Sequence, residues 1–449
     1  MPKRVVRRSL AVGLPLALLG TVCVAGTASG AQDRHERPEH TARVTGSAVL
    51  GDIPLAGFSN GLLPGTVADD RGVMLGGIGS DIYPAGRKGD FWTVTDRGPN
   101  GQIKVDGSKR RTFPVAGFDP AIVKVRASGK RLKVLRSIPL TTRSGAPVTG
   151  LPNQRGRDEA PYSYDAGTPL AYNANGLDTE GIVRAADGSF WLVDEYGPSL
   201  VHVSDRGRVL ARYVPEGLGL KGADYPVVEA LPRVLLHRKT NRGFEGLALL
   251  PGGDLVLAVQ SPLSLPDQDA GEASRNVRLL RFSTRKHAVT AEYAYRFDAV
   301  GVVDPGEDDT SELKVSSVVA IGRNELLVEE RTDRTARLHR VTLPRGAGIL
   351  GTVWDSPAAS PSYEQLTDPA ASGVPVLRKS LVVDLGRVAG VPGKIEGVAV
   401  TGRDSLALIN DNDFGMTDGA EAFDADGRLV DSGIETSVTL LKLPRPLTR

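Results

Sequence analysis

The sequence predicts an all-β protein, a β-propeller of five to six four-stranded blades with long inserted loops. One observation is a repeated pattern. An acidic residue is followed by a few small and apolar residues, then by a polar turn that contains glycine, and then by an apolar strand that ends in polar residues. The clearest copy runs from Asn175 to Pro198, and weaker copies occupy residues 79–98, 243–260, 314–331 and 394–413. The other observation is composition: 53 Gly, 30 Pro, short Val, Leu and Ile runs and almost no helical periodicity.

Each copy of the repeat has the pattern of a β-hairpin. A second strand pair usually follows, and four strands per repeat make a propeller blade. Arg43 to Leu50 and Ser437 to Leu443 are expected to share the closing blade, which leaves the count at five or six. The copies are farther apart than the roughly 40 to 50 residues of compact propeller repeats, which predicts inserted loops. The candidate loops are residues 141–174, 216–242, 261–275 and 345–378.

Residues 1–31 have the pattern of a secretory signal peptide: a basic start, an apolar run from Leu10 to Val24 and small residues up to Ala31. Arg7 and Arg8 also fit a twin-arginine export signal. We therefore expect a secreted, extracellular protein, exported by the Sec or the Tat route. The predicted parts of the chain are the signal peptide (1–31), a polar N-terminal segment (32–42) and one propeller domain (43–449).

Composition and charge exclude several classes of protein. The only cysteine, Cys23, lies in the predicted signal peptide, so the mature chain has to gain its stability from core burial instead of disulfides. The formal net charge is only +2 and no basic cluster carries stacking aromatic residues, which argues against a nucleic-acid partner. No segment after the signal peptide offers the ~18 apolar residues that span a membrane. We expect a monomer that acts on a small molecule.

The repeat also predicts a ring of charged side chains at one end of a central channel. In an antiparallel hairpin, the start of the first strand and the end of the second lie at the same edge. Radial repetition of the blades would bring these edges together. The expected carboxylates are Asp81, Asp96, Asp178, Glu180, Asp194, Glu195, Glu245, Glu330, Glu396, Asp411 and Asp413. The expected cations are Arg97, Arg242, Arg331 and Lys394.

So many carboxylates would repel one another unless they are protonated, paired or bound to a metal ion. Oxygen ligands favour Ca²⁺ over zinc or copper, and all six histidines fall outside the five hairpins. The alternative is structural: acids at strand ends can cap turns, and Arg97 and Arg331 can simply neutralise their neighbours. Trp92, Phe190 and Trp191 are expected to belong to the strand core.

A second motif points elsewhere. Gly57 to Gly61 matches the G-x-S-x-G nucleophile elbow, with Ser59 as the nucleophile. That elbow requires a strand before it and a helix after it, whereas Leu62-Leu63-Pro64-Gly65 follows here. The sequence therefore argues against a serine hydrolase.

The repeats resemble a family of secreted bacterial proteins known as "esterase-like activity of phytase", or phytase-like. The resemblance covers the chain from about Leu50 to the end. The segments that carry it are GGIGSDIY near Gly77, FWTVTDRGPNG from Phe91, NGLDTEGIV and FWLVDEYGPS in the second copy, GFEGLAL in the third, LLVEER in the fourth, and KIEGVAV with NDNDFG in the fifth. The fourth copy departs from the pattern, with Ser316 and Arg331 at positions that are acidic or amide elsewhere.

The resemblance implies a propeller hydrolase of phosphate esters or other esters, in which metal ions held by carboxylates bind the phosphate and activate water. It implies metal binding, most simply of Ca²⁺, at Glu180, Asp194, Glu195, Glu245, Glu396 and Asp411. The implied catalytic group is Asp96, Arg97, Arg331 and Lys394, with the three cations as phosphate partners.

Two other functions stay open. The Glu-Gly entry and the Asn-Asp exit of the repeat also resemble calcium lactonases of the gluconolactonase type, in which the metal polarises a lactone carbonyl. A non-catalytic binding propeller is the other alternative, because a fold by itself does not guarantee chemistry. The cations in the expected ring favour the phosphate-ester hydrolase slightly over the lactonase.

Overall fold

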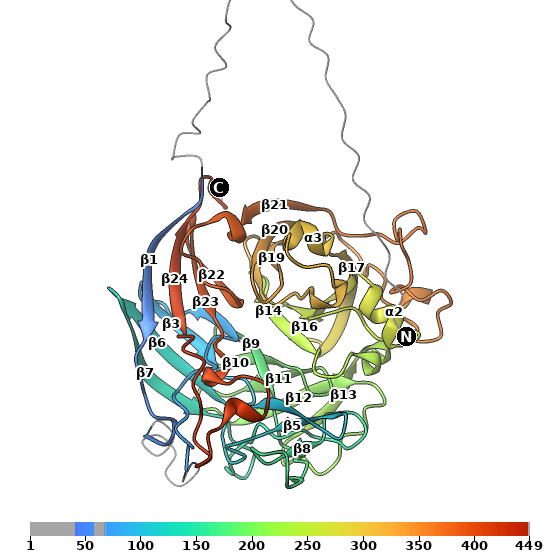
Figure 1. Ribbon diagram of the computed structural model, residues 1–449. Coiled ribbons are helices and arrows are strands. Elements are labelled where there is room, and N and C mark those ends of the chain that lie inside the picture. Colours follow the sequence, from blue (N-terminus) through green and yellow to red (C-terminus); the bar gives the residue numbers. More distant parts are fainter. Residues whose placement is uncertain (1–40, 58–66, 68, 448–449) are drawn as a thin grey trace, which may run out of the picture. The chain divides into compact units, whose positions relative to one another are not determined.

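The computed structural model describes residues 41–57, 67 and 69–447, and this part of the chain is built mostly of β-strands (Figure 1). The predicted signal peptide with Cys23 and the Ser59 motif lie outside the described residues. No helix in the described residues is long and apolar enough to cross a membrane.

The main strands of the described residues form five units of four neighbouring strands. The first contains β2 (Asp81–Pro84), β3 (Asp90–Val94), β6 (Ala121–Ser128) and β7 (Arg131–Pro139). The second contains β9 (Thr179–Arg184), β10 (Phe190–Asp194), β11 (Ser199–Val203) and β12 (Val209–Pro215), with β13 (Val227–Leu231) added in parallel. The third contains β14 (Phe244–Leu249), β15 (Leu255–Val259), β16 (Asn276–Ser283) and β17 (Ala288–Arg296).

The fourth unit contains β18 (Val318–Ala320), β19 (Glu325–Arg331), β20 (Ala336–Thr342) and β21 (Lys379–Asp384). The fifth contains β22 (Ile395–Gly402), β23 (Ser405–Asn410), β24 (Ser437–Lys442) and β1 (Arg43–Leu50). The antiparallel pairing of β1 with β24 confirms that the two ends of the domain share one unit. A short parallel contact between β1 and β7 joins the fifth unit to the first in one sheet.

The first strands of the five units contact one another in cyclic order: β2, β9, β14, β18, β22 and again β2. They therefore surround a common channel, as expected for a propeller-type fold. Trp92, Phe190 and Trp191 are buried between the sheets, as predicted.

The glycine of each Glu-Gly step lies where neighbouring first strands almost touch. A Cβ on Gly181 would be 2.8 Å from the carbonyl oxygen of Glu245, and one on Gly246 would be 2.8 Å from Val318. A Cβ on Gly397 would be 2.8 Å from the Cα of Asp81. Real Cβ atoms do not come this close, so the glycine in the repeat is explained by packing between units.

The remaining elements are short and lie in the connections. Strands β4 (Gly101–Val105), β5 (Ser108–Thr112) and β8 (Pro161–Tyr162) form a separate small sheet. The helices are α2 (Gln268–Ala273) and α3 (Val300–Val303). The 3₁₀ turns are η2 (Arg233–His237), η3 (Thr310–Glu312), η4 (Val353–Asp355), η5 (Leu385–Arg387), η6 (Asp413–Gly415) and η7 (Ala420–Ala422).

Candidate active site

Three glutamates of the repeat are each the extra residue of a β-bulge at the start of a first strand. The ladder of β9 with β10 skips Glu180, that of β14 with β15 skips Glu245, and that of β22 with β23 skips Glu396. A bulge turns the side chain of its extra residue away from the regular pleat. Carboxylate oxygens of these three glutamates lie within 4.8 Å of one another. The bulge therefore brings the acids of three units to one point.

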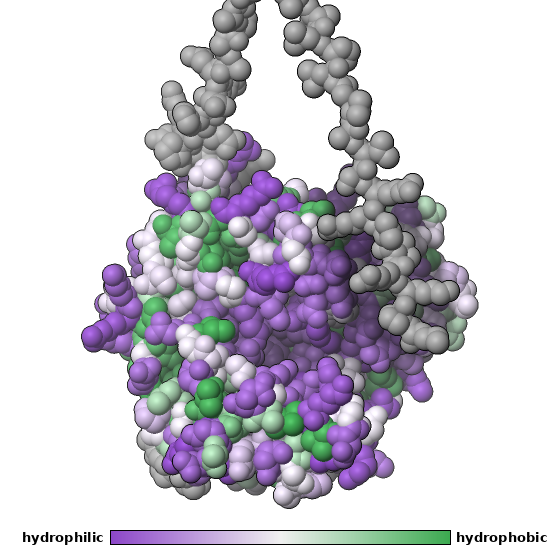
Figure 2. Space-filling view, viewed as in Figure 1, coloured by the Kyte–Doolittle hydropathy of each residue, from purple (hydrophilic) through white to green (hydrophobic). Residues whose placement is uncertain are grey.

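These glutamates line a polar cavity of about 190 Å³, here called the carboxylate cavity. The molecular face shown in Figure 2 is hollowed near its centre and largely hydrophilic there. The residues that line the cavity are Ser80, Asp96, Arg97, Asn100, Arg111, Glu180, Glu195, Asn241, Arg242, Glu245, Gln260, Lys314, Arg331, Lys394, Glu396, Asp411 and Asp413. The structure thus brings together every predicted catalytic residue and every predicted metal ligand except Asp194.

Glu180 and Glu195 are the acids without partners. Their side chains are 8% and 3% exposed, and neither carboxylate forms a hydrogen bond or ion pair within the described part of the chain. With Asp178 they offer three carboxylate oxygens within 4.8 Å of one another. Burial, and then the carboxylates of Glu245 and Asp178, raise the pKa of Glu180 well above its usual range. Burial and then Asp178 do the same to the pKa of Glu195. This arrangement calls for a proton or a cation.

Arg331 neutralises the other two glutamates of the ring. Its guanidinium binds Glu396 and lies 3.7 Å from a carboxylate oxygen of Glu245. Its Nε donates to the hydroxyl of Ser316 at 2.6 Å, and Nη1 donates to Asp333 at 2.8 Å. The departure of the fourth copy therefore has a physical reason, because this unit contributes a cation where the others contribute acids. Each nitrogen of Arg331 thus has a contact within the protein, and its expected role as a phosphate partner stays a prediction.

Lys394 and Arg97 are also paired. The ammonium of Lys394 donates to Asp411 at 2.8 Å and binds Asp413 as well. Arg97 lies 3.3 Å from Asp178 and 3.4 Å from Glu159. These contacts fit the alternative in which the cations neutralise neighbouring acids.

Arg242 differs from these cations. It has no ion pair with any described residue, and its only side-chain hydrogen bond goes to the hydroxyl of Ser261 at 3.3 Å. Asp96 supplies a further titratable group: burial, then Asp411 and Asp178, raise its pKa well above its usual range.

A family model described as "Phytase-like: Esterase-like activity of phytase" matches residues 74–414. The chain belongs to this family. Its curated relative from Arthroderma benhamiae, described as an uncharacterized secreted protein, is 28% identical over 298 residues, which are 57% of this chain and 58% of the relative. The match thus spans less than two thirds of that protein.

Solved structures similar to this phytase-like chain include two propeller-type proteins. The calcium-binding protein regucalcin from Agrobacterium tumefaciens is 10% identical, with 85% of this chain and 94% of that chain covered and a TM-score of 0.35. The PQQ-bound aldose sugar dehydrogenase from Streptomyces coelicolor is 12% identical, with 84% and 97% covered and a TM-score of 0.34.

Asp194 lies outside the carboxylate cavity of this phytase-like protein. Its fully buried carboxylate accepts hydrogen bonds from the backbone of Asp178 at 2.7 Å, from Ser199 at 2.6 Å and from Arg212 at 2.6 Å. The physical reason is alternation, since Asp194 and Glu195 are consecutive and only one of them can face the channel. The expectation that Asp194 binds the metal is not supported by these contacts.

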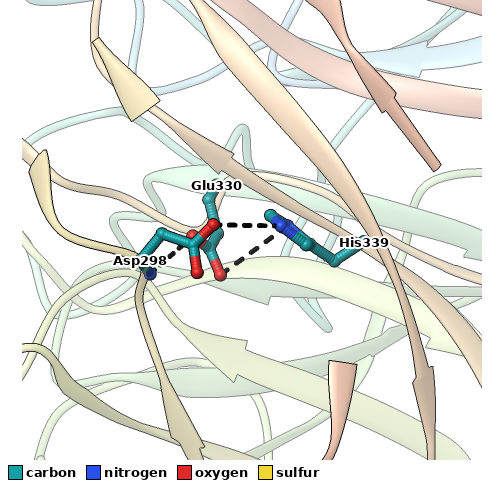
Figure 3. Close-up of side chains that lie close together, drawn as sticks. All are labelled: Asp298, Glu330 and His339. Atoms are coloured by element: carbon teal, nitrogen blue, oxygen red, sulfur yellow. Dashed lines mark hydrogen bonds and ion pairs between the residues drawn. The ribbon is translucent and has the colours of Figure 1, made fainter. Parts of the chain in front are cut away.

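Glu330 is also turned away from the cavity, although we expected it in the ring. It binds Lys379, and it accepts hydrogen bonds from the hydroxyl of Tyr295 and the backbone of Asp298. Figure 3 shows Glu330 beside Asp298 and His339. Although these three could hold a metal by spacing, Lys379 lies 2.9 Å and Arg337 3.1 Å from Asp298, so two cations already pair with the two acids. This cluster is an ion-pair network between units.

Sequence reasoning missed Glu329, whose carboxylate is fully buried without a hydrogen bond to any described residue. Burial raises its pKa well above the usual range, and Arg331 lowers it. The alternation of side chains along β19 could have predicted it. Glu329 and Arg331 lie on one face of the strand, and Glu330 lies on the other. Cavity residues from outside the hairpin repeat, such as Asn241 in a loop and Arg111 in β5, carry no signal in the repeat.

Proposed function

We propose that this phytase-like protein is a secreted, calcium-dependent hydrolase of phosphate esters, built as a five-bladed propeller. The five units and the ring of first strands support the blade count. The N-terminal pattern and the secreted relative support export. The observation that carries the activity is the pair of buried, unpartnered carboxylates, Glu180 and Glu195, in a cavity that also holds the unpaired Arg242.

The atoms that could bind a metal ion in the cavity fit calcium. They are oxygens only, and buried acceptor atoms of Glu245, Gln260 and Asp411 also lack hydrogen-bond partners among the described residues. Carboxylates and amide carbonyls are the ligands that Ca²⁺ prefers. The residues that would hold the ion are Glu180, Glu195, Glu245, Glu396 and Asp411. A bound ion would polarise a phosphoryl oxygen and lower the pKa of a water molecule.

The protein's own side chains have separate roles in this proposal. Arg242 binds a non-bridging oxygen of the phosphate, because its guanidinium has no ion pair with a described residue and only one hydrogen bond, to Ser261. Arg331 positions Glu245 and Glu396, while Lys394 positions Asp411. Asp96 lines the cavity with a pKa raised well above its usual range, and it donates a proton to the leaving alcohol oxygen.

The experiment is a substrate screen with the purified mature protein in CaCl₂ and after EDTA treatment. The substrates are p-nitrophenyl phosphate, bis-p-nitrophenyl phosphate, phytate, short acyl esters and lactones. We expect calcium-dependent hydrolysis of a phosphate ester, and loss of that activity in Glu180→Gln. Turnover of lactones or acyl esters alone would assign the protein to the lactonase or esterase class, and no turnover at all would favour a binding propeller.

A further inference from the structure

A second cavity of about 500 Å³ adjoins the carboxylate cavity. Arg111, Asn241 and Arg242 line both cavities, so the two meet at these side chains. The second cavity is lined mainly by polar and charged side chains from the β4–β5 hairpin, the loop after η2 and helix α2. A ligand in the carboxylate cavity can therefore extend toward α2.

The loop Lys239–Arg242 lies where the two cavities meet. The backbone N–H of Arg242 donates to the carbonyl of Lys239 at 3.1 Å, which closes the loop as a turn. The next residue, Gly243, packs on the site itself, since a Cβ there would lie 2.3 Å from the carbonyl oxygen of Glu195. The turn is thus held directly against a residue of the carboxylate cavity.

The side chains of this loop have almost no partners within the described part of the chain. The ammonium of Lys239 forms no hydrogen bond or ion pair, and the carboxamide of Asn241 forms no hydrogen bond, although its oxygen is buried. Arg242 has only the hydroxyl of Ser261. Two cations and an amide therefore line the cavity with most of their hydrogen-bonding capacity unused.

The other buried cations of the same cavity are neutralised. Arg111 donates to both carboxylate oxygens of Glu159, at 3.0 and 3.1 Å. Arg238 binds Asp158 at 2.5 Å. Each of these arginines forms an ion pair with an acid, whereas Lys239 and Arg242 form none with any described residue. The loop therefore differs from the rest of the cavity.

The cavity on the opposite side of the site lacks this feature. It has a volume of about 580 Å³, shares Lys394, Asp411 and Asp413 with the carboxylate cavity and includes the apolar Val391 and Met416. Its one lysine, Lys394, is paired with both aspartates. A ligand that spans the site therefore meets unpaired positive charge on the Lys239 side only.

We propose that the loop Lys239–Arg242 binds a second anionic group of the substrate, so that the substrate is an ester with a phosphate or carboxylate group besides the phosphate being cleaved. Lys239 and Asn241 donate to the oxygens of this second group, while Arg242 lies between it and the reacting phosphate. An anion there would satisfy side chains that the protein leaves without partners. Burial, and then the guanidinium of Arg242, lower the pKa of Lys239 to about 8, while the carboxylates of Glu272, Asp309 and Glu312 oppose the shift. The inference rests on the proposed function.

The first test is binding without calcium or turnover. Isothermal titration of the full mature protein in EDTA and low salt would use inorganic phosphate and, separately, acetate as probes. We expect Lys239→Met to weaken binding of the preferred probe about tenfold or more, the effect of losing one charged hydrogen bond. Lys109→Met, an exposed cation of the same cavity, is the matched control and should change it less than twofold. Equal binding by wild type and Lys239→Met would overturn the proposal.

The second test compares phenyl phosphate, 4-carboxyphenyl phosphate and 1,4-phenylene bisphosphate with calcium present. We expect wild type to prefer a substrate with two anionic groups, and the ratio of its kcat/KM to that of phenyl phosphate to fall about tenfold in Lys239→Met. The preferred member identifies a carboxylate or a phosphate as the second group. An unchanged ratio would refute the inference while the hydrolase proposal stands. No hydrolysis by wild type, together with Lys239-dependent phosphate binding, would refute the hydrolase and keep the anion site.

Discussion

Arg331 of the fourth unit binds the carboxylate of Glu396 of the fifth unit, and both side chains are buried at the end of the channel. The same guanidinium lies near Glu245 of the third unit, so one cation links three units. Removing it would leave the buried carboxylate of Glu245 without an ion pair among the described residues, and that of Glu396 with only Lys394, at 4.0 Å. The family resemblance implies a phosphate-binding role for Arg331, which stays a prediction, and the contacts add a structural role between the units.

We expect Arg331→Met to lower the free energy of unfolding by about 3–5 kcal/mol, the range for breaking a buried ion pair. Chemical denaturation followed by circular dichroism would measure this loss. Lys442→Ala removes an exposed pair with Asp404 and is the control, with little change expected. An Arg331→Met protein with the wild-type midpoint would show that the link is dispensable and would return Arg331 to the list of substrate contacts.

Glu180 gives the calcium prediction. An ion that binds only the folded protein stabilises it by about 2.7 kcal/mol at a hundredfold excess over Kd. Wild type should therefore melt at a higher temperature in CaCl₂ than in EDTA, and Glu180→Gln should lose this difference. In EDTA the variant should be at least as stable as wild type, because it removes an unpartnered buried carboxylate. Glu325→Gln, a partly exposed acid of another edge, should keep the calcium response. Identical melting of wild type with and without calcium would contradict the site.

Gly397 tests the packing between units. An alanine Cβ at this position would meet the Cα of Asp81 and the backbone nitrogen of Ile82, both at 2.8 Å. Since backbone atoms cannot move aside cheaply, Gly397→Ala should destabilise the fold by about 1–3 kcal/mol. Gly402→Ala lies in the same strand, where the nearest atom is 3.6 Å away, and should be tolerated. Equal midpoints for the two variants in denaturant would show that the first strands are not packed this closely.

Glu292 gives a prediction about pH and stability. It is buried against Arg278 at 2.6 Å, and burial raises its pKa from 4.5 to about 7. The folded protein therefore binds this proton more tightly than the unfolded chain does. Its contribution to stability is complete below about pH 4.5 and is lost as the pH rises through 7. Glu292→Gln should remove this loss, so the stability of the variant relative to wild type should increase between pH 5 and pH 8. Parallel stability curves over that range would disprove the assignment.

The parts of the fold that repeat could be predicted from the sequence. The hairpins, the shared closing unit of β1 and β24, and the convergence of Glu180, Glu245 and Glu396 all follow from one recurring register. The register was informative because the Glu-Gly step serves the same purpose in three units, with the glycine at the close contact and the glutamate in the bulge.

The parts that do not repeat could not be predicted in the same way. The choice between Asp194 and Glu195 depends on a partner in another strand, Arg212, which the hairpin pattern does not contain. Asn241 and Arg111 reach the site from connections, where local sequence gives no register. The alternation of side chains along β19 would have placed Glu329 in the predicted ring instead of Glu330, because the strand itself shows which residues share a face with Arg331.

Lys239 connects the proposed anion site to stability. In the folded protein its pKa is lowered from 10.5 to about 8, first by burial and then by Arg242, while Glu272 of α2, Asp309 and Glu312 of η3 oppose the shift. The unfolded chain therefore holds this proton more tightly, so stability increases as the pH rises from 8 toward 10.5 and the full cost of the charge is present at pH 7. Lys239→Met removes that cost and should raise the melting temperature at pH 7, with a smaller gain at pH 10. Lys109→Met should change neither value. A variant that binds anions less well but is more stable is expected where a ligand site is kept at the expense of stability; a less stable Lys239→Met protein would instead indicate that the lysine holds the loop in place.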